Sequence, residues 1–387
     1  MTYISPSSIK SFTLDILDED FAKFTQLLEL SRIGPLVYET SEQNGLKFGI
    51  THEWITKTKD YWLHEYDWRA QEKHINSFPN YTVEIEGLTV HFVALFSEKE
   101  DAVPITLLHG WPGSFIEFLP MASLLREKYL PKDLPYHIII PSIPGYTLSS
   151  GGPLDKEWCV SDSARVLHIL MLELGFKRYI AHGGDVGSFL ATTMAVSYEQ
   201  CVALHLNSPS SLIIPEEGSN GKELSNFEKK IIERAKSWAE EGKGYAIEHN
   251  TRPATIGLAI NSNPLSLLSW IGEKFIEWSD QTPSIDEILT NVSLYWFTNS
   301  FPRSIYPYRT IFSKSDEAVP GFPYVIKPLG FSWFTSEIMP GFQSAILKQG
   351  NLVFHRTHDK GGHFAAIERP MDMLQDIEDF AHLVWQV

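Results

Sequence analysis

The chain has 387 residues, a length that suits one large α/β domain carrying an insertion. Acidic residues outnumber basic ones by 48 to 32, and the formal net charge of −16 disfavours a nucleic acid or an anionic membrane as partner, since either requires a basic surface. Two cysteines cannot form a disulfide framework, and no run of about 18 apolar residues offers a membrane span. The first residues hold no signal-like apolar stretch, so we expect a cytoplasmic globular protein without a membrane anchor.

The expected elements change in character along the chain. Residues 11–78 carry apolar side chains at three- and four-residue spacing, which predicts helices, and residues 81–95 alternate as strands do, with Gly87 at a hairpin turn. Short apolar runs then alternate with helical segments: a strand before His109, a helix near 114–128, a strand from His137, a helix near 161–175, a strand at 177–183 and a helix beginning at Ser188. This alternation predicts a mostly parallel sheet covered on both faces.

The alternation stops after residue 207. Residues 208–315 are typical of helices rich in aromatic side chains, and strand-like runs return only at 322–328 and 351–357. An insertion of this length between strands is most simply a lid over the C-terminal edge of the sheet, where such sheets place their sites. We therefore expect four segments: an N-terminal extension (1–103), the first part of the core (104–207), the helical lid (208–315) and the second part of the core (316–387).

The sharpest local signal lies between the strand ending at Gly183 and the helix that follows it. The turn Gly183-Gly184-Asp185-Val186-Gly187 has the small–x–nucleophile–x–small spacing of a nucleophile elbow, where glycines permit a strained backbone and close packing. Its central residue is a carboxylate, which is ionised at neutral pH and needs no base before it attacks. The alternative is that Asp185 only caps the helix. No GxSxG sequence occurs, which argues against a serine hydrolase.

A second glycine-rich turn, His109-Gly110-Trp111-Pro112-Gly113, follows the preceding strand. Backbone N–H groups in such a turn can stabilise a developing oxyanion together with the N–H of the residue after the nucleophile. We expect the amides of Trp111 and Val186 to be these donors, with an ordinary β–α turn as the alternative. We interpret His109 as a residue that braces the loop.

The general base is expected just past the last strand. His363 follows two glycines and has the position that the order nucleophile, acid, histidine gives to the base of α/β hydrolases. His355 and His358 lie on or just after the strand, and we interpret them as structural. The acid partner should follow the preceding strand, where the first carboxylate is Glu337. Asp359 is closer to His363 in sequence, but we expect it to face water and favour Glu337.

Taken together, these motifs resemble the microsomal-type epoxide hydrolases of the α/β-hydrolase superfamily. The resemblance covers essentially the whole chain, is closest to the soluble fungal members, and rests on Asp67-Trp68-Arg69, EIEGLTVHF, HGWPGSFIEF, PSIPGYTLSSG, HGGDVGS, EHNTRPATIG, SFPRSIYPYR and GGHFAAIERP in that order. It implies an α/β-hydrolase fold with a mostly parallel central sheet, a helical lid inserted between core strands, and an N-terminal extension wrapping the core. The membrane anchor of the mammalian members finds no counterpart here, so the resemblance implies no membrane location.

The resemblance also implies a reaction that converts an epoxide to a vicinal diol. Asp185 would attack an epoxide carbon and form a hydroxyalkyl-enzyme ester, and His363 would then activate the water that hydrolyses this ester. In the family pattern, the position of the acid that orients His363 corresponds to Glu337, whereas some fungal members have Asp at this position.

Two lid tyrosines complete the implied site by hydrogen-bonding the epoxide oxygen. By motif they are Tyr245 and Tyr308, with Tyr306 as a competitor for the second position. A phenol has a pKa of about 10, so it can donate to the much more basic alkoxide while staying neutral in the resting enzyme. The alternative for any lid tyrosine is a packing role with its hydroxyl satisfied elsewhere.

The implied reaction needs no metal or cofactor, and no motif suggests one. The implied partners are a small apolar or aryl epoxide and water, with a homodimer as the assembly and detoxification or aromatic hydrocarbon catabolism as the role. A haloalkane dehalogenase would share the fold and Asp185, but in that family the residue after the nucleophile commonly gives a side-chain N–H donor, and Val186 has none. A further alternative is a non-catalytic binding protein on the same fold. Such a protein would not need a suitable residue at every catalytic position, whereas this sequence has one at each.

Overall fold

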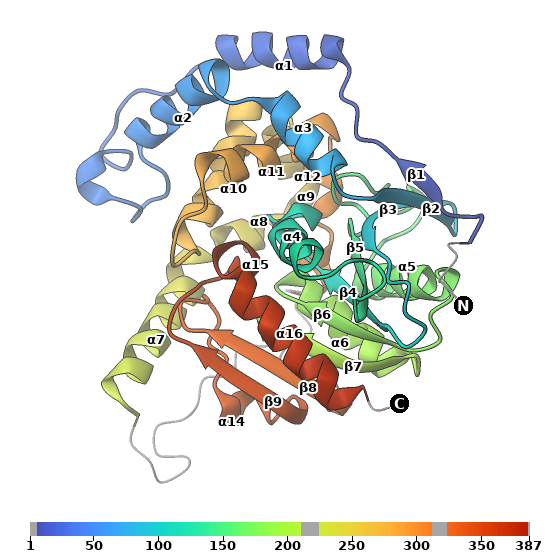
Figure 1. Ribbon diagram of the computed structural model, residues 1–387. Coiled ribbons are helices and arrows are strands. Elements are labelled where there is room, and N and C mark those ends of the chain that lie inside the picture. Colours follow the sequence, from blue (N-terminus) through green and yellow to red (C-terminus); the bar gives the residue numbers. More distant parts are fainter. Residues whose placement is uncertain (1–5, 210–223, 312–322, 386–387) are drawn as a thin grey trace.

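The computed structural model describes residues 6–209, 224–311 and 323–385, and a nine-stranded sheet forms its centre (Figure 1). The strand order is β1-β2-β3-β5-β4-β6-β7-β8-β9. The pairs β1–β2, β2–β3 and β3–β5 are antiparallel, and every pair from β5–β4 to β8–β9 is parallel. The strands are β1 (Lys10–Phe12), β2 (Asn80–Ile85), β3 (Leu88–Leu95), β4 (Val103–Leu108), β5 (Tyr136–Pro141), β6 (Tyr179–Gly183), β7 (Cys201–Leu206), β8 (Val325–Phe334) and β9 (Gly350–His358).

Helices cover both faces of the parallel strands. The side chains of these strands point alternately to the two faces, and on each face they pack with helices into an apolar cluster. In β4, Ile105 and Leu107 pack into one cluster and Leu108 into the other. The first cluster also receives α4 and α16, and the second receives α5 and α6. The core helices are η2 (Phe115–Phe118), α4 (Leu119–Lys128), α5 (Val160–Glu173), α6 (Val186–Ser197), α14 (Gln343–Ile346), α15 (Ala365–Glu368) and α16 (Pro370–Val384). The predicted mostly parallel, doubly covered sheet is confirmed.

The lid helices lie between β7 and β8 in the chain. In Figure 1, α8 to α12 lie above the sheet and α7 extends downward at the left of it. Of the predicted limits of the lid, 208 lies two residues after the end of β7, whereas 315 falls in segment 312–322, outside the described residues. The described lid elements are α7 (Asn226–Ser237), η3 (Trp238–Gly242), α8 (Gly244–Thr251), α9 (Pro253–Ile260), α10 (Pro264–Glu277), α11 (Ile285–Phe297), α12 (Phe301–Ser304) and α13 (Pro307–Ile311).

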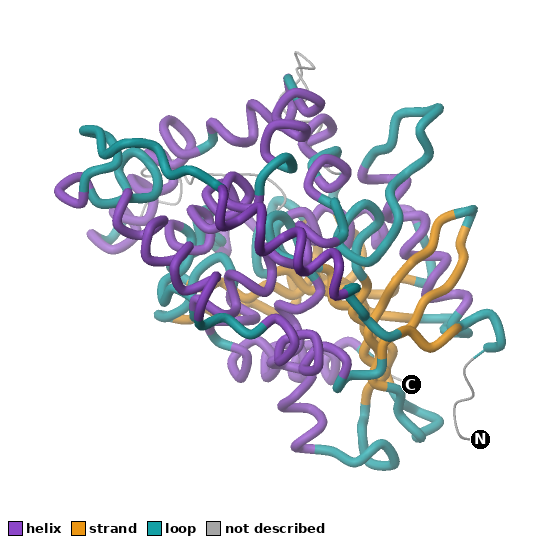
Figure 2. The backbone as a smooth tube through the Cα atoms, turned by 90° about the horizontal axis from the view of Figure 1, so that it is seen from above, coloured by secondary structure: helices purple, strands orange, loops and turns teal. Residues whose placement is uncertain are grey.

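The N-terminal extension packs on the outer side of the lid, where Figure 1 shows its blue helices above α10 and α11. The Tyr61 hydroxyl donates to Asp286 at 2.9 Å, and Asn263 donates to the Ser31 hydroxyl at 2.7 Å. The same extension supplies β1 to β3 to one edge of the sheet, so it touches both core and lid; Figure 2 shows these layers from above. Its helical elements are α1 (Asp18–Leu30), η1 (Glu42–Asn44), α2 (His52–His64) and α3 (Trp68–Asn76).

Several predicted limits need correction. The expected helices across 11–78 begin later, because Lys10–Phe12 pair with β2 as a short strand, a tertiary contact that overrides the local pattern. The helix expected from Ser188 begins at Val186, and the one near 114–128 begins with a 3₁₀ turn. β8 runs on to Phe334, beyond the expected 322–328, because it pairs with β9 along its length. The hairpin at Gly87 is confirmed: Glu86 and Gly87 both have positive φ, 51° and 81°, as a type I′ turn requires.

Among the described residues, no helix combines the length and the apolar character needed to cross a membrane.

Candidate active site

Asp185 occupies a strained turn at the carboxyl end of β6, directly before α6. Its φ of 48° and ψ of −127° lie outside the regions that residues with a Cβ normally adopt. The glycines around it permit this turn: a Cβ on Gly187 would lie 2.0 Å from the carbonyl oxygen of Leu108, and one on Gly183 would lie 2.1 Å from that of Gly187. The elbow geometry therefore follows from strand and helix backbones that nearly touch.

The Asp185 carboxylate points toward the second glycine-rich turn. Its Oδ1 accepts a hydrogen bond of 2.8 Å from the Trp111 amide, and a Cβ on Gly110 would lie 2.3 Å from the same oxygen. Burial raises the pKa of Asp185, while the charge of His363 and the amides of Val186 and Trp111 act to lower it. Although Asp185 stands at the N-cap position of α6, its side chain makes no capping hydrogen bond there. The carboxylate is thus held by the donors expected of an oxyanion site.

The lid helix α11 fixes the turn that carries Trp111. Asn291 donates to the carbonyl of Pro112 at 2.6 Å and accepts from the Ser114 hydroxyl at 2.7 Å. Tyr295 donates to the carbonyl of Gly113 at 2.9 Å. These bonds hold the amide of Trp111 in place from a helix about 180 residues away in sequence.

His109 is buried beneath this turn, as a bracing residue should be. Its Nε2 accepts a hydrogen bond from the amide of Ile143 at 3.2 Å, and burial lowers its pKa to about 4. The other two histidines interpreted as structural also have partners away from the site: His355 contacts the carbonyl of Gly341, and His358 lies 2.7 Å from Asp376.

His363 lies between two carboxylates. Its Nδ1 is 2.9 and 3.0 Å from the two oxygens of Glu337, and its Nε2 is 3.6 Å from Oδ2 of Asp185. Burial alone would lower the pKa of His363, but the carboxylates of Glu337 and Asp185 outweigh this effect and raise the pKa to about 9. The imidazole is therefore protonated at neutral pH in the resting site.

The two candidates for the acid partner differ in burial. Glu337 follows β8 and is 1% exposed, with both oxygens on His363, whereas Asp359 is exposed. Arg234 of the lid helix α7 donates to the carbonyls of Thr335 and Glu337 and so ties down the loop that carries Glu337.

Tyr245 and Tyr308 meet beside Trp111 at the underside of the lid. The Tyr245 ring stacks on Trp111 with a centroid separation of 5.2 Å, and Tyr308 stands edge-on to Trp111 at 5.8 Å. Their side chains are hydrogen-bonded to each other, and burial together with the charge of Asp185 keeps their pKa values well above 10. Both phenols are thus neutral at physiological pH. Tyr306 instead lies 2.6 Å from the hydroxyl of Ser163 on α5.

Two neighbours of this site escaped the sequence analysis. Trp278, at the end of α10, accepts a hydrogen bond of 3.0 Å from the His363 amide and packs edge-on against its imidazole at 5.0 Å. Nothing in its sequence context singles it out among eleven tryptophans. Glu117 also lies beside the site. The sequence could have indicated it, because it belongs to the motif HGWPGSFIEF.

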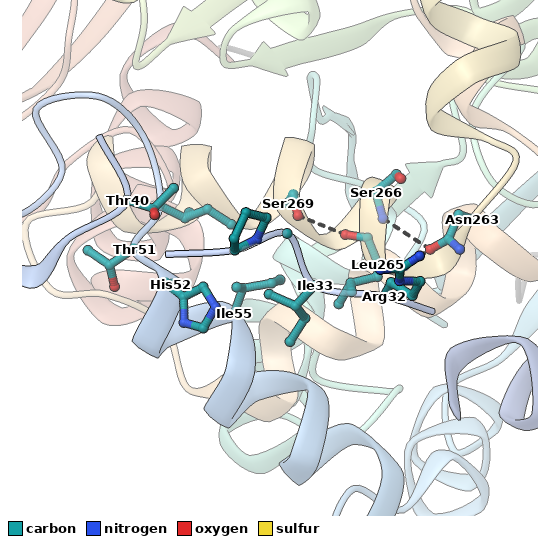
Figure 3. Close-up of a pocket in the computed structure, with 13 residues that line it drawn as sticks. Arg32, Ile33, Thr40, Thr51, His52, Ile55, Asn263, Leu265, Ser266 and Ser269 are labelled. Atoms are coloured by element: carbon teal, nitrogen blue, oxygen red, sulfur yellow. Dashed lines mark hydrogen bonds between the residues drawn. The ribbon is translucent and has the colours of Figure 1, made fainter. Parts of the chain in front are cut away.

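A small cavity of about 20 Å³ lies against the reactive groups, lined among others by Asp185, His363, Glu117, Trp111 and Asn207. A larger one of about 360 Å³ lies between the loop after α1, the start of α2 and the outer side of α10 (Figure 3). No residue predicted for the site lines this larger space, so the chemistry belongs to the smaller cavity.

Known proteins resemble this chain in both sequence and fold. Residues 9–118 match the family model described as the epoxide hydrolase N terminus, and residues 103–247 match that of the alpha/beta hydrolase fold. The structure of Aspergillus niger epoxide hydrolase superposes with a TM-score of 0.93 and 48% identity, covering 99% of both chains. Juvenile hormone epoxide hydrolase from the silkworm Bombyx mori superposes with a TM-score of 0.85 and 25% identity, covering 98% of this chain and 96% of that one.

Epoxide hydrolase 1 of Sus scrofa is 30% identical over 422 aligned residues, which cover 98% of this chain and 90% of the relative. Likeness of this extent, over both core and lid, shows the family. The chain belongs to the epoxide hydrolases of the α/β-hydrolase fold and is an epoxide-hydrolysing enzyme.

Proposed function

We propose that this enzyme converts epoxides to vicinal diols through a covalent hydroxyalkyl ester on Asp185. The observation that carries the proposal is the different surroundings of the two oxygens of Asp185. Oδ1 accepts from the Trp111 amide, and Oδ2 faces His363. Oδ2 is thus the oxygen free to attack carbon, and Oδ1 is the one that can carry charge when the ester is hydrolysed.

In the first step, Oδ2 attacks an epoxide carbon and the ring C–O bond breaks. The electron pair of that bond moves to the ring oxygen, which takes a proton from the Tyr245 and Tyr308 pair. Their close packing on Trp111 and the hydrogen bond between them support a joint role, because both hydroxyls can then face one oxygen atom. Tyr306 is assigned a structural role through its contact with Ser163.

Ester formation prepares His363 for the second step. The charge of Asp185 helps to raise the pKa of His363, and this charge disappears when the carboxylate becomes an ester. The pKa of His363 therefore falls, and its proton returns to the phenolate left by the first step. A neutral imidazole, oriented by Glu337, then faces the ester as a base.

In the second step, His363 removes a proton from water and the resulting hydroxide attacks the carboxyl carbon of Asp185. Negative charge develops on Oδ1, where the amides of Trp111 and Val186 stabilise it. The bond between the carboxyl carbon and Oδ2 breaks, and the leaving alkoxide takes the proton of the new carboxyl group. The diol thus departs with Oδ2, and a carboxylate beside a protonated histidine remains.

The walls around the tyrosines support a small apolar or aryl epoxide as the substrate. Trp111, Tyr245 and Tyr308 surround the ring of His249 with centroid separations of 4.6 to 5.6 Å, and Trp278 packs on Tyr245 at 5.3 Å. Burial lowers the pKa of His249 to about 3, so this imidazole is neutral, and the ammonium of Lys274 lies over the Tyr245 ring at 4.7 Å. Such surfaces favour apolar and aromatic ligands.

The proposal is tested by trapping the ester. His363→Gln removes the base for the second step but leaves the nucleophile and the tyrosines, so we expect the variant to accumulate an adduct when mixed with styrene oxide. Mass spectrometry of the intact protein should show one added substrate mass, and peptide mapping should assign it to Asp185. Asp185→Ala/His363→Gln is the control, and it should remain unmodified. An unmodified His363→Gln variant that still binds the epoxide would contradict the proposal.

A further inference from the structure

Glu117 lies where two small cavities meet. The first, of about 20 Å³, is the one it lines with Asp185 and His363. The second, of about 40 Å³, lies on its other side and is lined by Glu117 together with Phe275, Asn291 and the exposed Glu287 of α11. Each space is large enough for a water molecule, which needs roughly 10–15 Å³ measured in this way. The side chain thus separates the reactive groups from a space that leads toward the surface.

The Glu117 carboxyl group has hydrogen-bonding capacity that the protein does not use. Within the described parts of the chain, no other residue makes a hydrogen bond with it. The carboxyl lies against the turn before η2, since a Cβ on Gly113 would lie 2.3 Å from its Oε2. The Glu117 side chain is partly buried, and both cavities that it lines can hold a water partner for its carboxyl group.

Electrostatics makes Glu117 a suitable donor. Burial raises its pKa to about 8; the charge of His363 acts to lower this pKa and that of Asp185 acts to raise it. At neutral pH the side chain is therefore mostly a neutral carboxylic acid, with one O–H donor and a carbonyl acceptor. It can hold water without placing a second full negative charge beside the carboxylate of Asp185.

We propose that Glu117 is a positioning residue that holds the hydrolytic water beside His363 and the carboxyl carbon of Asp185, and that the cavity behind it supplies this water. The proposal rests on the proposed function, because it concerns the second step only. The water accepts a hydrogen bond from the Glu117 carboxyl group and donates one to Nε2 of His363. When it attacks, its proton passes to His363 and Glu117 keeps its own, so Glu117 acts through the water alone.

The test separates the two steps by rapid mixing of excess enzyme with styrene oxide, followed by acid quench and mass spectrometry of the ester. In Glu117→Leu we expect ester formation within about threefold of the wild-type rate and ester hydrolysis slowed by roughly 10²-fold, the cost of a misplaced reactant. Glu117→Gln keeps a neutral donor and acceptor and should restore hydrolysis to within about tenfold of wild type. The exposed Glu127 gives the matched control, and Glu127→Leu should leave both rates unchanged.

A second variant tests the proposal independently, in case Glu117→Leu does not fold. Gly113→Ala keeps Glu117 in the chain but places a Cβ on the position of its carboxyl group, so it should reproduce the selective loss of hydrolysis. Equal slowing of both steps in Glu117→Leu, or hydrolysis at the wild-type rate, would overturn the proposal. Absence of any ester in the wild type as well as in His363→Gln would instead contradict the proposed function, so the two failures are distinguishable.

Discussion

A carboxylate that is removed from water stays charged only if other groups stabilise its charge. For Asp185 these groups are two backbone amides and the imidazolium of His363. Burial raises the pKa of Asp185, and His363, Val186 and Trp111 each counteract that effect. The same groups have later uses in the proposed reaction, because the Trp111 amide faces Oδ1 and the imidazolium faces Oδ2. The features that keep the nucleophile charged thus also prepare the hydrolysis of its ester.

The two tyrosines of the second motif should respond differently to loss of the hydroxyl. In Tyr308→Phe we expect ester formation to slow by about 10²-fold or more, because the epoxide oxygen loses a donor during ring opening. Tyr306→Phe removes the hydrogen bonds of this hydroxyl with Ser163 and Trp158, so it should lower the free energy of unfolding by about 1 kcal/mol and leave ester formation unchanged. Single-turnover rates and urea denaturation of both variants measure these effects. Slowed ester formation in Tyr306→Phe alone would exchange the two roles.

A site residue can be predicted from the sequence only when a local motif marks its position. Asp185 and His363 follow strands in turns with a recognisable glycine pattern, so position alone suggests them. Tyr306 and Tyr308 share one motif, and only the direction of each ring, toward Ser163 or toward Tyr245, separates them. Trp278 has no local signal, because its contact with His363 exists only once the lid is folded onto the core.

At the scale of elements, the closest approach lies between α6 and β4. We expect Gly187→Ala to destabilise the protein by about 3 kcal/mol or more, because the added Cβ would meet the Leu108 carbonyl at 2.0 Å and neither backbone can yield easily. Helix propensity alone predicts the opposite, a gain of up to about 1 kcal/mol.

The matched control for this substitution is Gly34→Ala. Gly34 is exposed, and a Cβ there would meet nothing within 4 Å, so the change should stay within about 0.5 kcal/mol. Urea denaturation curves give both values. A stable Gly187→Ala protein with normal activity would show that strand and helix do not need this proximity.

The elements that periodicity predicts best are those whose neighbours in space are also neighbours in sequence. The alternation of β4 to β7 with α4 to α6 follows from apolar runs that are buried on both faces. β1 could not be predicted in this way, since only its pairing with β2 about 70 residues later makes Lys10–Phe12 a strand. The end of β8 depends likewise on its pairing with β9.

Across the whole molecule, the site is assembled by three separate layers. The core carries Asp185 and His363, the lid carries the two tyrosines and Trp278, and the N-terminal extension contacts the outer side of the lid through bonds such as that of Tyr61 to Asp286. The sequence predicts these layers in outline, because each has its own pattern. The homodimer and the cytoplasmic location remain predictions.

Global stability should fall as the pH rises past neutrality. The pKa of His363 is raised from 6.5 to about 9, so the stability it contributes is complete below about pH 6.5 and is lost as the pH rises through 9. This contribution corresponds to roughly 3 kcal/mol. In His363→Gln we expect a lower stability at pH 6 but a smaller decrease between pH 6 and pH 9.5. Denaturant titrations at several pH values test this, and an equal decrease in both proteins would contradict it.

The central claim, that an enzyme oxygen enters the product, is tested most directly by one turnover in oxygen-18 water. Enzyme in excess is mixed with styrene oxide, and the diol is analysed by mass spectrometry. We predict that this first diol carries no label, because its new oxygen is Oδ2 of Asp185, and that the label appears in Asp185 instead. A labelled diol in the first turnover would mean that water attacks the epoxide directly, and it would contradict the covalent mechanism.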